Sequence, residues 1–175
     1  MKTLILSSSL SKNSRSFILC TKIMNDLQKK GIKTDLVDAR KIKLVPHHTK
    51  LTSDMQELKI KIEHSDNIII GMGVHNYSIN DGLKIILDNC FVNLEGKFYG
   101  IVCAAGGEKS YLSTMHLTQI CMNEWRMIQL PRIVYATQKE FHENIISNTE
   151  LLDRIQLFVK EFITIGKKLI KPINS

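Results

Sequence analysis

The sequence has few of the residues that define a disulfide-rich or metal-binding domain. Its four cysteines stand at positions 20, 90, 103 and 121, and no two of them form a CxxC pair. Structural zinc sites, disulfide scaffolds and iron–sulfur clusters all need ligands at closer spacing. We therefore expect buried, free thiols in a reducing compartment and no metal site.

The glycine motifs of common nucleotide-binding folds are also absent. The chain has 9 glycines, but they form neither a GxxxxGK[ST] phosphate loop nor a GxGxxG dinucleotide turn. Because a pyrophosphate needs such glycines for close backbone approach, a terminal monophosphate suits any phosphate site in this chain better.

Long hydrophobic runs and clustered charge are missing as well. The chain starts with MKTLIL and passes directly into serines, so its first apolar run is too short for a signal peptide or a membrane span. We therefore expect a cytoplasmic protein with no membrane partner. The net charge of +7 comes from scattered lysines without interleaved aromatic residues, and we interpret it as a solvated surface rather than a nucleic-acid site.

A regular alternation of apolar runs and helical patterns extends from end to end. This alternation is typical of βαβ units around a parallel sheet. The predicted strands cover residues 2–7, 33–37, 67–71, 99–104 and 132–136. The predicted helices cover about residues 14–30, 53–64, 82–91, 110–127 and 148–171. With no repeat or linker in view, we expect one α/β domain over residues 1–175.

The loop after the first predicted strand has the composition of an anion site. Residues 7–16 (SSSLSKNSRS) include six serines, Lys12 and Arg15, and they lead into a helix. Backbone N–H groups and the helix dipole attract anions at such a position, and ligands bind at the carboxyl ends of parallel strands. No acidic residue precedes Asp26. The loop therefore predicts phosphate binding; the alternative is a serine-rich turn with an ordinary helix cap.

Two further loops reach the same edge of the predicted sheet. Residues 72–82 (MGVHNYSINDG) offer amide, hydroxyl and aromatic groups suited to a planar heterocycle. The alternative is a capping turn, with Asn80 or Asp81 as the cap. Residues 104–110 (AAGGEKS) contain glycines that let the backbone approach a flat ligand, although alone they could be a turn. Three loops at one edge predict a single site for a flat, phosphate-bearing ligand.

These segments resemble the NAD(P)H-dependent FMN reductase family of flavodoxin-like proteins. The family's opening loop has the form GSxRxxS, and residues 8–14 read SSLSKNS. Its PEYNxSxP loop corresponds to residues 73–80 (GVHNYSIN), and the resemblance continues to residues 131–136. It implies one FMN-binding domain with a doubly wound, five-stranded parallel sheet of order 2-1-3-4-5 and helices on both faces.

The resemblance also implies which residues hold FMN. The phosphate would lie on the serines of the first loop, the ring against residues 75–78, and the pyrimidine edge on residues 105–107. The predicted cofactor-binding residues are Ser9, Ser11, Ser14, Arg15, Ser16, His75, Asn76, Tyr77, Ser78, Ala105, Gly106 and Gly107. The chain departs from the family pattern at Ser8 (glycine in the family), Ser11 (arginine), Val74 (glutamate) and Asn80 (proline).

The implied activity is an oxidoreductase that passes hydride from NAD(P)H to FMN and on to a small acceptor, such as free flavin or a quinone. Since the cofactor carries this chemistry, we expect no catalytic side chain. The six histidines are scattered, and we interpret His47 and His48 as surface residues. The alternative is a non-enzymatic, flavodoxin-type electron carrier, although such carriers tend to be acidic. A phosphorylation receiver is excluded because Ser7, Ser8 and Gly71 stand where it needs acidic residues.

Two predicted helices have more apolar surface than one sheet face can cover. The first spans about Leu83 to Phe91. The second carries Tyr111, Leu112, Met115, Met122, Trp125 and Ile128. The family commonly pairs through such helices, so we expect a homodimer or homotetramer.

Overall fold

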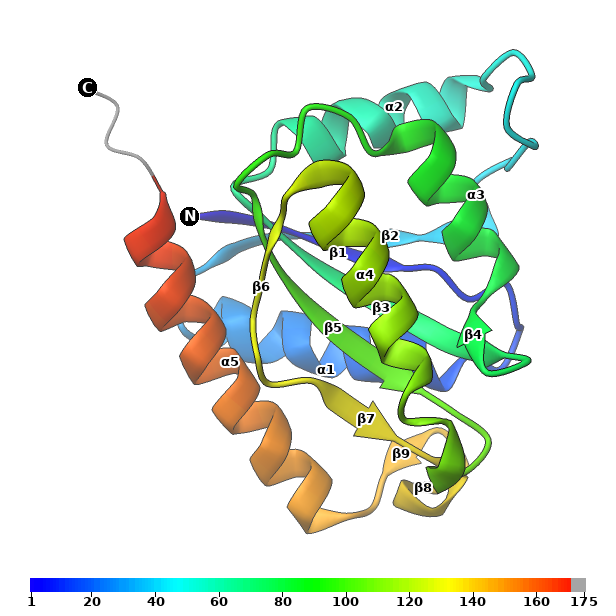
Figure 1. The fold of residues 1–175 in the computed structure, drawn as a ribbon. Coiled ribbons are helices and arrows are strands. Elements are labelled where there is room, and N and C mark those ends of the chain that lie inside the picture. Colours follow the sequence, from blue (N-terminus) through cyan, green and yellow to red (C-terminus); the bar gives the residue numbers. More distant parts are fainter. Residues whose placement is uncertain (171–175) are drawn as a thin grey trace.

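A computed structural model describes residues 1–170 as a parallel sheet between two layers of helices (Figure 1). The sheet order is β2 (Lys33–Asp38), β1 (Lys2–Ser7), β3 (Asn67–His75) and β5 (Phe98–Ala104), followed by an edge position. At this edge β6 (Ile128–Gln129) pairs with the start of β5 and β7 (Val134–Ala136) pairs with its end. All of these pairings are parallel, which confirms the predicted order 2-1-3-4-5.

The edge strand is shorter than predicted and is divided in two. The predicted strand covered residues 132–136, whereas β7 begins at Val134 and is separated from β6 by a segment containing Pro131. Proline lacks the N–H group that a sheet ladder needs, so the pairing is interrupted there.

The helices cover both faces of the sheet, as predicted. One layer contains α1 (Arg15–Lys29) and α5 (Thr149–Leu169). The other contains α2 (Ser53–Glu63), α3 (Asp81–Cys90) and α4 (Ser113–Trp125). Leu4 and Leu6 of β1 pack against the second layer, and Ile5 packs against the first, because successive strand side chains point to opposite faces.

Helix boundaries differ little from those predicted. A short 3-10 turn, Glu108–Ser110, precedes α4, which therefore begins later than residue 110. The last helix was predicted to reach Lys171, a residue outside the described part of the chain. Gly31 follows α1 with a φ of 73°, as expected of a glycine just past a helix end.

The segment after the third strand is a hairpin rather than an open loop. β3 continues to His75 and then pairs antiparallel with β4 (Ser78–Ile79). Asn76 and Tyr77 form the turn with φ values of 49° and 59°, the conformation that reverses a strand in two residues. The prediction ended the strand at Gly71 because the continuous apolar run ends there.

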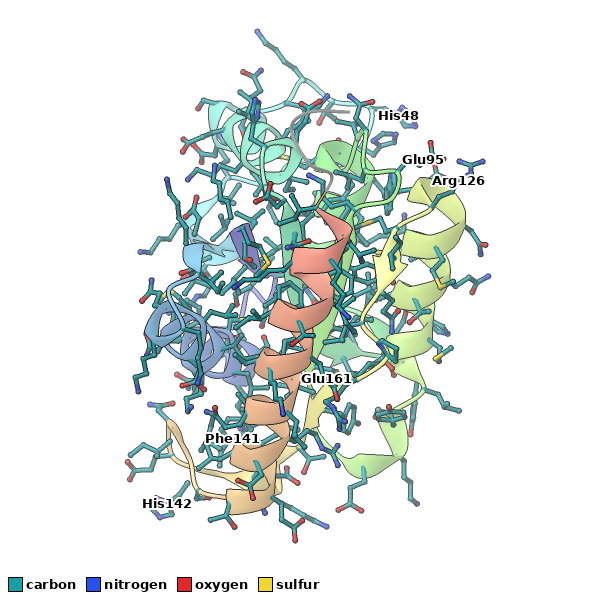
Figure 2. All side chains as sticks on the ribbon, turned by 90° about the vertical axis from the view of Figure 1, so that its left-hand side faces the viewer. His48, Glu95, Arg126, Phe141, His142 and Glu161 are labelled. Carbon is teal, nitrogen blue, oxygen red and sulfur yellow. The ribbon has the colours of Figure 1, made fainter. Side chains whose placement is uncertain are left out.

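A second hairpin, absent from the prediction, lies between β7 and α5. It joins β8 (Phe141–His142) to β9 (Ile145–Ile146). Figure 2 shows Phe141 and His142 beside the N-terminal end of α5. Strands of two residues are too short for an alternating pattern to reveal them.

The four cysteines are free and buried, as predicted. His47 and His48 are exposed, in agreement with their interpretation as surface residues. Within residues 1–170, no helix is long and apolar enough to cross a membrane. The same residues contain no group of three or more histidine, cysteine, aspartate or glutamate side chains that could hold a metal ion.

Candidate functional site

A hollow of about 160 Å³ opens at the carboxyl end of the sheet. Among the predicted cofactor-binding residues, its lining includes Ser9, Ser11, Ser14, Arg15, Ser16, His75, Ala105 and Gly106. It also includes four residues that were not predicted: Asn13, Gly73, Val74 and Ala104. The three predicted loops therefore do meet, and no acidic side chain is among the lining residues.

Larger hollows lie elsewhere on the surface. One of about 680 Å³ is lined by side chains of α3 and α4 together with His47. Its lining includes the acidic side chains Asp88 and Glu124, which repel anions, and none of the residues described in its lining caps or begins a helix. The smaller hollow at the sheet edge is therefore the better anion site despite its size.

Ser14 begins α1 and faces the hollow. Its Oγ accepts a hydrogen bond from the Phe17 N–H (3.1 Å) and lies 3.0 Å from the Ser16 Oγ. Capping uses only an oxygen lone pair, so the Ser14 hydroxyl proton can still be donated to Ser16 or to a ligand. An ordinary helix cap and a phosphate site are therefore compatible at this residue.

Arg15 belongs to the serine loop (residues 7–16) and Arg40 contacts that loop, but the partners of the two arginines differ. Arg40 forms an ion pair with Asp38 (2.7 Å), donates to the Lys12 carbonyl oxygen (3.0 Å), and lies over the Phe17 ring (4.4 Å). Its charge is thus neutralised while it fixes the loop. Burial raises the pKa of Asp38, but the Arg40 hydrogen bonds more than offset this and hold that pKa below its usual value.

Arg15 is the cation among the residues that line the hollow. Within residues 1–170 no ion pair joins it to a carboxylate. Its guanidinium lies instead 6.0 Å from the centre of the Phe141 ring, in the second hairpin. Arg15 lines the hollow beside the serines, where it can pair with an anion.

The remaining predicted residues lie outside the lining of the hollow. Asn76 and Tyr77 form the exposed turn of the β3–β4 hairpin, and the Tyr77 side chain is 64% exposed. The Ser78 Oγ lies 3.0 Å from His116 Nδ1, and the Gly107 carbonyl accepts a hydrogen bond from the Tyr135 hydroxyl (2.6 Å). None of these four residues is in the hollow itself.

The backbone at Gly106 and Gly107 faces open space. A Cβ atom added to either residue would have no heavy atom within 4 Å. A flat group can therefore approach this backbone closely. An anion pocket of hydroxyls, helix N-terminus and one arginine, next to an open glycine segment, suits a flat ligand that carries a phosphate.

Sequence reasoning missed two residues that position the serine loop. Arg40 lies in the 3-10 turn Ala39–Lys41 that follows β2, and Asn80 is the residue before α3. From the sequence, Asn80 was a possible cap and a departure from the family's proline. Its side chain makes no cap hydrogen bond and contacts the serine loop instead. An asparagine before a helix can cap that helix or bind a distant loop, and the local sequence is the same in both cases. No signal in the sequence therefore distinguished the two roles.

Comparisons with known proteins agree with this geometry. A family model described as NADPH-dependent FMN reductase matches residues 1–142. No curated protein matches the chain.

Solved structures share the fold at low sequence identity. An NADH:FMN oxidoreductase in its apo form is 13% identical, with a TM-score of 0.80 over 98% of this chain and 91% of that chain. A flavoenzyme NAD(P)H:(acceptor) oxidoreductase from Paracoccus denitrificans is 17% identical, with a TM-score of 0.74 over 95% and 97%. A flavodoxin from the domain Archaea is 17% identical, with a TM-score of 0.65 over 97% and 99%.

The family match includes every strand of the large sheet and all three loops of the hollow. The chain therefore belongs to the NADPH-dependent FMN reductase family and is an FMN-dependent NAD(P)H oxidoreductase with a flavodoxin-like fold.

Proposed function

We propose that this chain holds the FMN phosphate in the hollow between the serine loop and the N-terminus of α1. The observation that carries the proposal is the combination of Ser14 at the helix start with Arg15, which has no carboxylate partner among the described residues. The Ser9, Ser11 and Ser16 hydroxyls and the first-turn N–H groups supply further donors to the phosphate oxygens.

The flat ring of the cofactor lies, in this proposal, between the Asn76–Tyr77 turn and the segment of Ala105, Gly106 and Gly107. The open backbone at the glycines and the exposed turn support this placement. His75 and Ser78 flank the turn and are themselves held, because His75 Nδ1 lies 3.5 Å from Asp81 Oδ1 and Ser78 contacts His116. These side chains bind and orient a planar ligand.

When bound, FMN would accept hydride from NAD(P)H and pass electrons to a small acceptor. The protein's part is to position the planar partners, and no side chain is required as a general acid or base. One open face beside residues 73–80 and 105–107 has room for a single planar partner at a time. NAD(P)H and the acceptor therefore bind alternately, which predicts parallel lines in double-reciprocal plots.

Comparing two flavins tests the phosphate site directly. The apoprotein is titrated with FMN and with riboflavin, which differs only by the phosphate, and binding is followed by flavin fluorescence. We expect FMN to bind at least about tenfold more tightly, since a hydrogen bond to a charged group contributes about 1.5–3 kcal/mol. Equal affinities would place the phosphate outside the hollow.

We also propose that the protein is a homodimer that pairs through α4. The first helix predicted to have spare apolar surface, Leu83 to Phe91, does not support pairing, because its large apolar side chains are buried or half-buried within the chain. Leu112, just before α4, and Met115 and Met122 on α4 are 73%, 49% and 51% exposed. Such a group of exposed, large apolar side chains is typical of an interface. A monomer mass in dilute-solution light scattering would contradict the proposal. Met122→Glu should shift a dimer toward monomer, whereas Leu157→Glu, on the similarly exposed outer side of α5, should not.

The proposed location is the cytoplasm, where reducing conditions preserve thiols. The four free, buried cysteines support this location. The alternative function, a non-enzymatic electron carrier, shares the flavin site but requires no reduction by nicotinamide. Anaerobic mixing with NADH or NADPH therefore separates the two functions.

A further inference from the structure

Two of the chain's departures from the family pattern lie in direct contact. The family has glycine and proline where this chain has Ser8 and Asn80, residues 72 positions apart. The Ser8 hydroxyl lies 3.0 Å from Asn80 Oδ1 and 2.8 Å from the Gly71 carbonyl oxygen, so its proton is shared between them. Neither glycine nor proline has a side chain that could form this contact.

Both polar atoms of the Asn80 side-chain amide form hydrogen bonds with backbone in or next to the lining of the hollow. Its Nδ2 donates to the Ser8 carbonyl oxygen (2.9 Å), and its Oδ1 accepts from the Gly73 N–H (3.1 Å). Since a carbonyl can only accept and a backbone N–H can only donate, these two partners fix the orientation of the amide. Gly73 lines the hollow, and Ser8 directly precedes Ser9, which also lines it.

The burial of this contact makes it rigid. Asn80 and Ser8 are both 0% exposed, so water cannot replace the hydrogen bonds. The first turn of α3 lies close to the same carbonyl: a Cβ atom added at Gly82 would be only 2.7 Å from the Ser8 oxygen, so only glycine fits there. The start of the serine loop is therefore held by α3 and β3 together.

We infer that Asn80 is a positioning residue that sets this protein's preference for a phosphate-bearing flavin. It holds the serine loop and Gly73 at a fixed separation, so that the donors of the hollow are arranged for a phosphate in advance. Pre-arranged donors strengthen binding because less ordering is required on association. Asn80 itself does not line the hollow, so it acts only through Ser8 and Gly73. The inference rests on the proposed phosphate site.

Asn80→Ala tests this role, with Asn89→Ala as its matched control. Asn89 lies near the end of α3, the helix that Asn80 precedes; it is 9% exposed and likewise donates its amide to a backbone carbonyl, that of Ile85 (2.8 Å). The readout is the ratio of riboflavin to FMN dissociation constants, measured beside the thermal unfolding midpoint. We expect both variants to lose stability, but only Asn80→Ala to lower the ratio, by about tenfold.

Asn80→Asp provides a second variant of nearly the same volume if Asn80→Ala does not fold. At pH 8 its carboxylate would repel the Ser8 carbonyl oxygen while still accepting from Gly73, so the ratio should again fall. A wild-type ratio in the folded variant would overturn the inference while leaving the proposed site intact. A wild-type protein that binds FMN and riboflavin equally would overturn the proposed site and the inference with it.

Discussion

Ser14→Asp should separate helix stability from cofactor binding. Ser14 caps α1 through the Phe17 N–H and is only 6% exposed. Aspartate is as good a helix cap as serine, and its charge suits the helix N-terminus. The free energy of unfolding of the variant should therefore stay close to that of the wild type. The same carboxylate, however, would occupy the position that we propose for the phosphate.

The expected loss of FMN affinity follows from the charges. Two unit charges 4 Å apart repel by about 1 kcal/mol in water and about 4 kcal/mol near a protein surface. Because a phosphate monoester carries a charge of about −1.5 to −2, the penalty is at least about 1.5 kcal/mol, or about tenfold in affinity. Ser14→Ala should behave differently: it should lose about 1 kcal/mol of stability with the cap and bind FMN about 10- to 150-fold more weakly.

The assay pairs urea unfolding with fluorescence titration of FMN. Asn148→Asp is the matched control, because Asn148 caps α5 through the Leu151 N–H (2.7 Å) and is not among the residues that line the hollow. This control should bind FMN as the wild type does. If Ser14→Asp also binds FMN normally, the reasoning is refuted and the phosphate lies elsewhere.

Three further outcomes are expected. The pKa of Asp38 is lowered in the folded protein. The Asp38 carboxylate therefore stabilises the fold above the ordinary aspartate pKa of about 3.9, and this stabilisation is lost as the pH falls. Acid unfolding of Asp38→Asn should therefore depend less on pH below about pH 4 than acid unfolding of the wild type. Burial raises the pKa of Cys103 to about 12 and also raises the pKa of the other three thiols. A thiol reagent should therefore label the protein only after unfolding. Asn76→Ala or Tyr77→Ala should reduce turnover more than His48→Ala does, and equal effects would contradict a role for the turn in positioning.

The sequence predicted the sheet and most of the hollow because both depend on local patterns. Continuous apolar runs such as residues 67–71 identify buried parallel strands, and strand order follows from the family resemblance. The serine loop was recognised because its composition and its place before a helix both indicate an anion site. Its predicted members Ser9, Ser11, Ser14, Arg15 and Ser16 all line the hollow.

What could not be predicted depends on contacts between distant segments. Asn80 and Ser8 are far apart in the chain. Nothing in either local sequence indicates that the Asn80 side-chain amide donates to the Ser8 carbonyl oxygen. The extension of β3 to His75 depends on pairing with β4, which forms only if Asn76 and Tyr77 adopt positive φ. Tyrosine is uncommon in that conformation, so propensity favours an open loop there.

Anaerobic reduction by nicotinamide tests the central claim most directly. The protein is loaded with FMN, freed of unbound flavin and oxygen, and mixed with excess NADH or NADPH while the flavin absorbance near 450 nm is followed. An FMN-dependent oxidoreductase should lose this absorbance with at least one of the two reductants and regain it when an acceptor is added. Bound FMN that keeps its absorbance with both reductants would contradict the account and leave the electron-carrier function in its place.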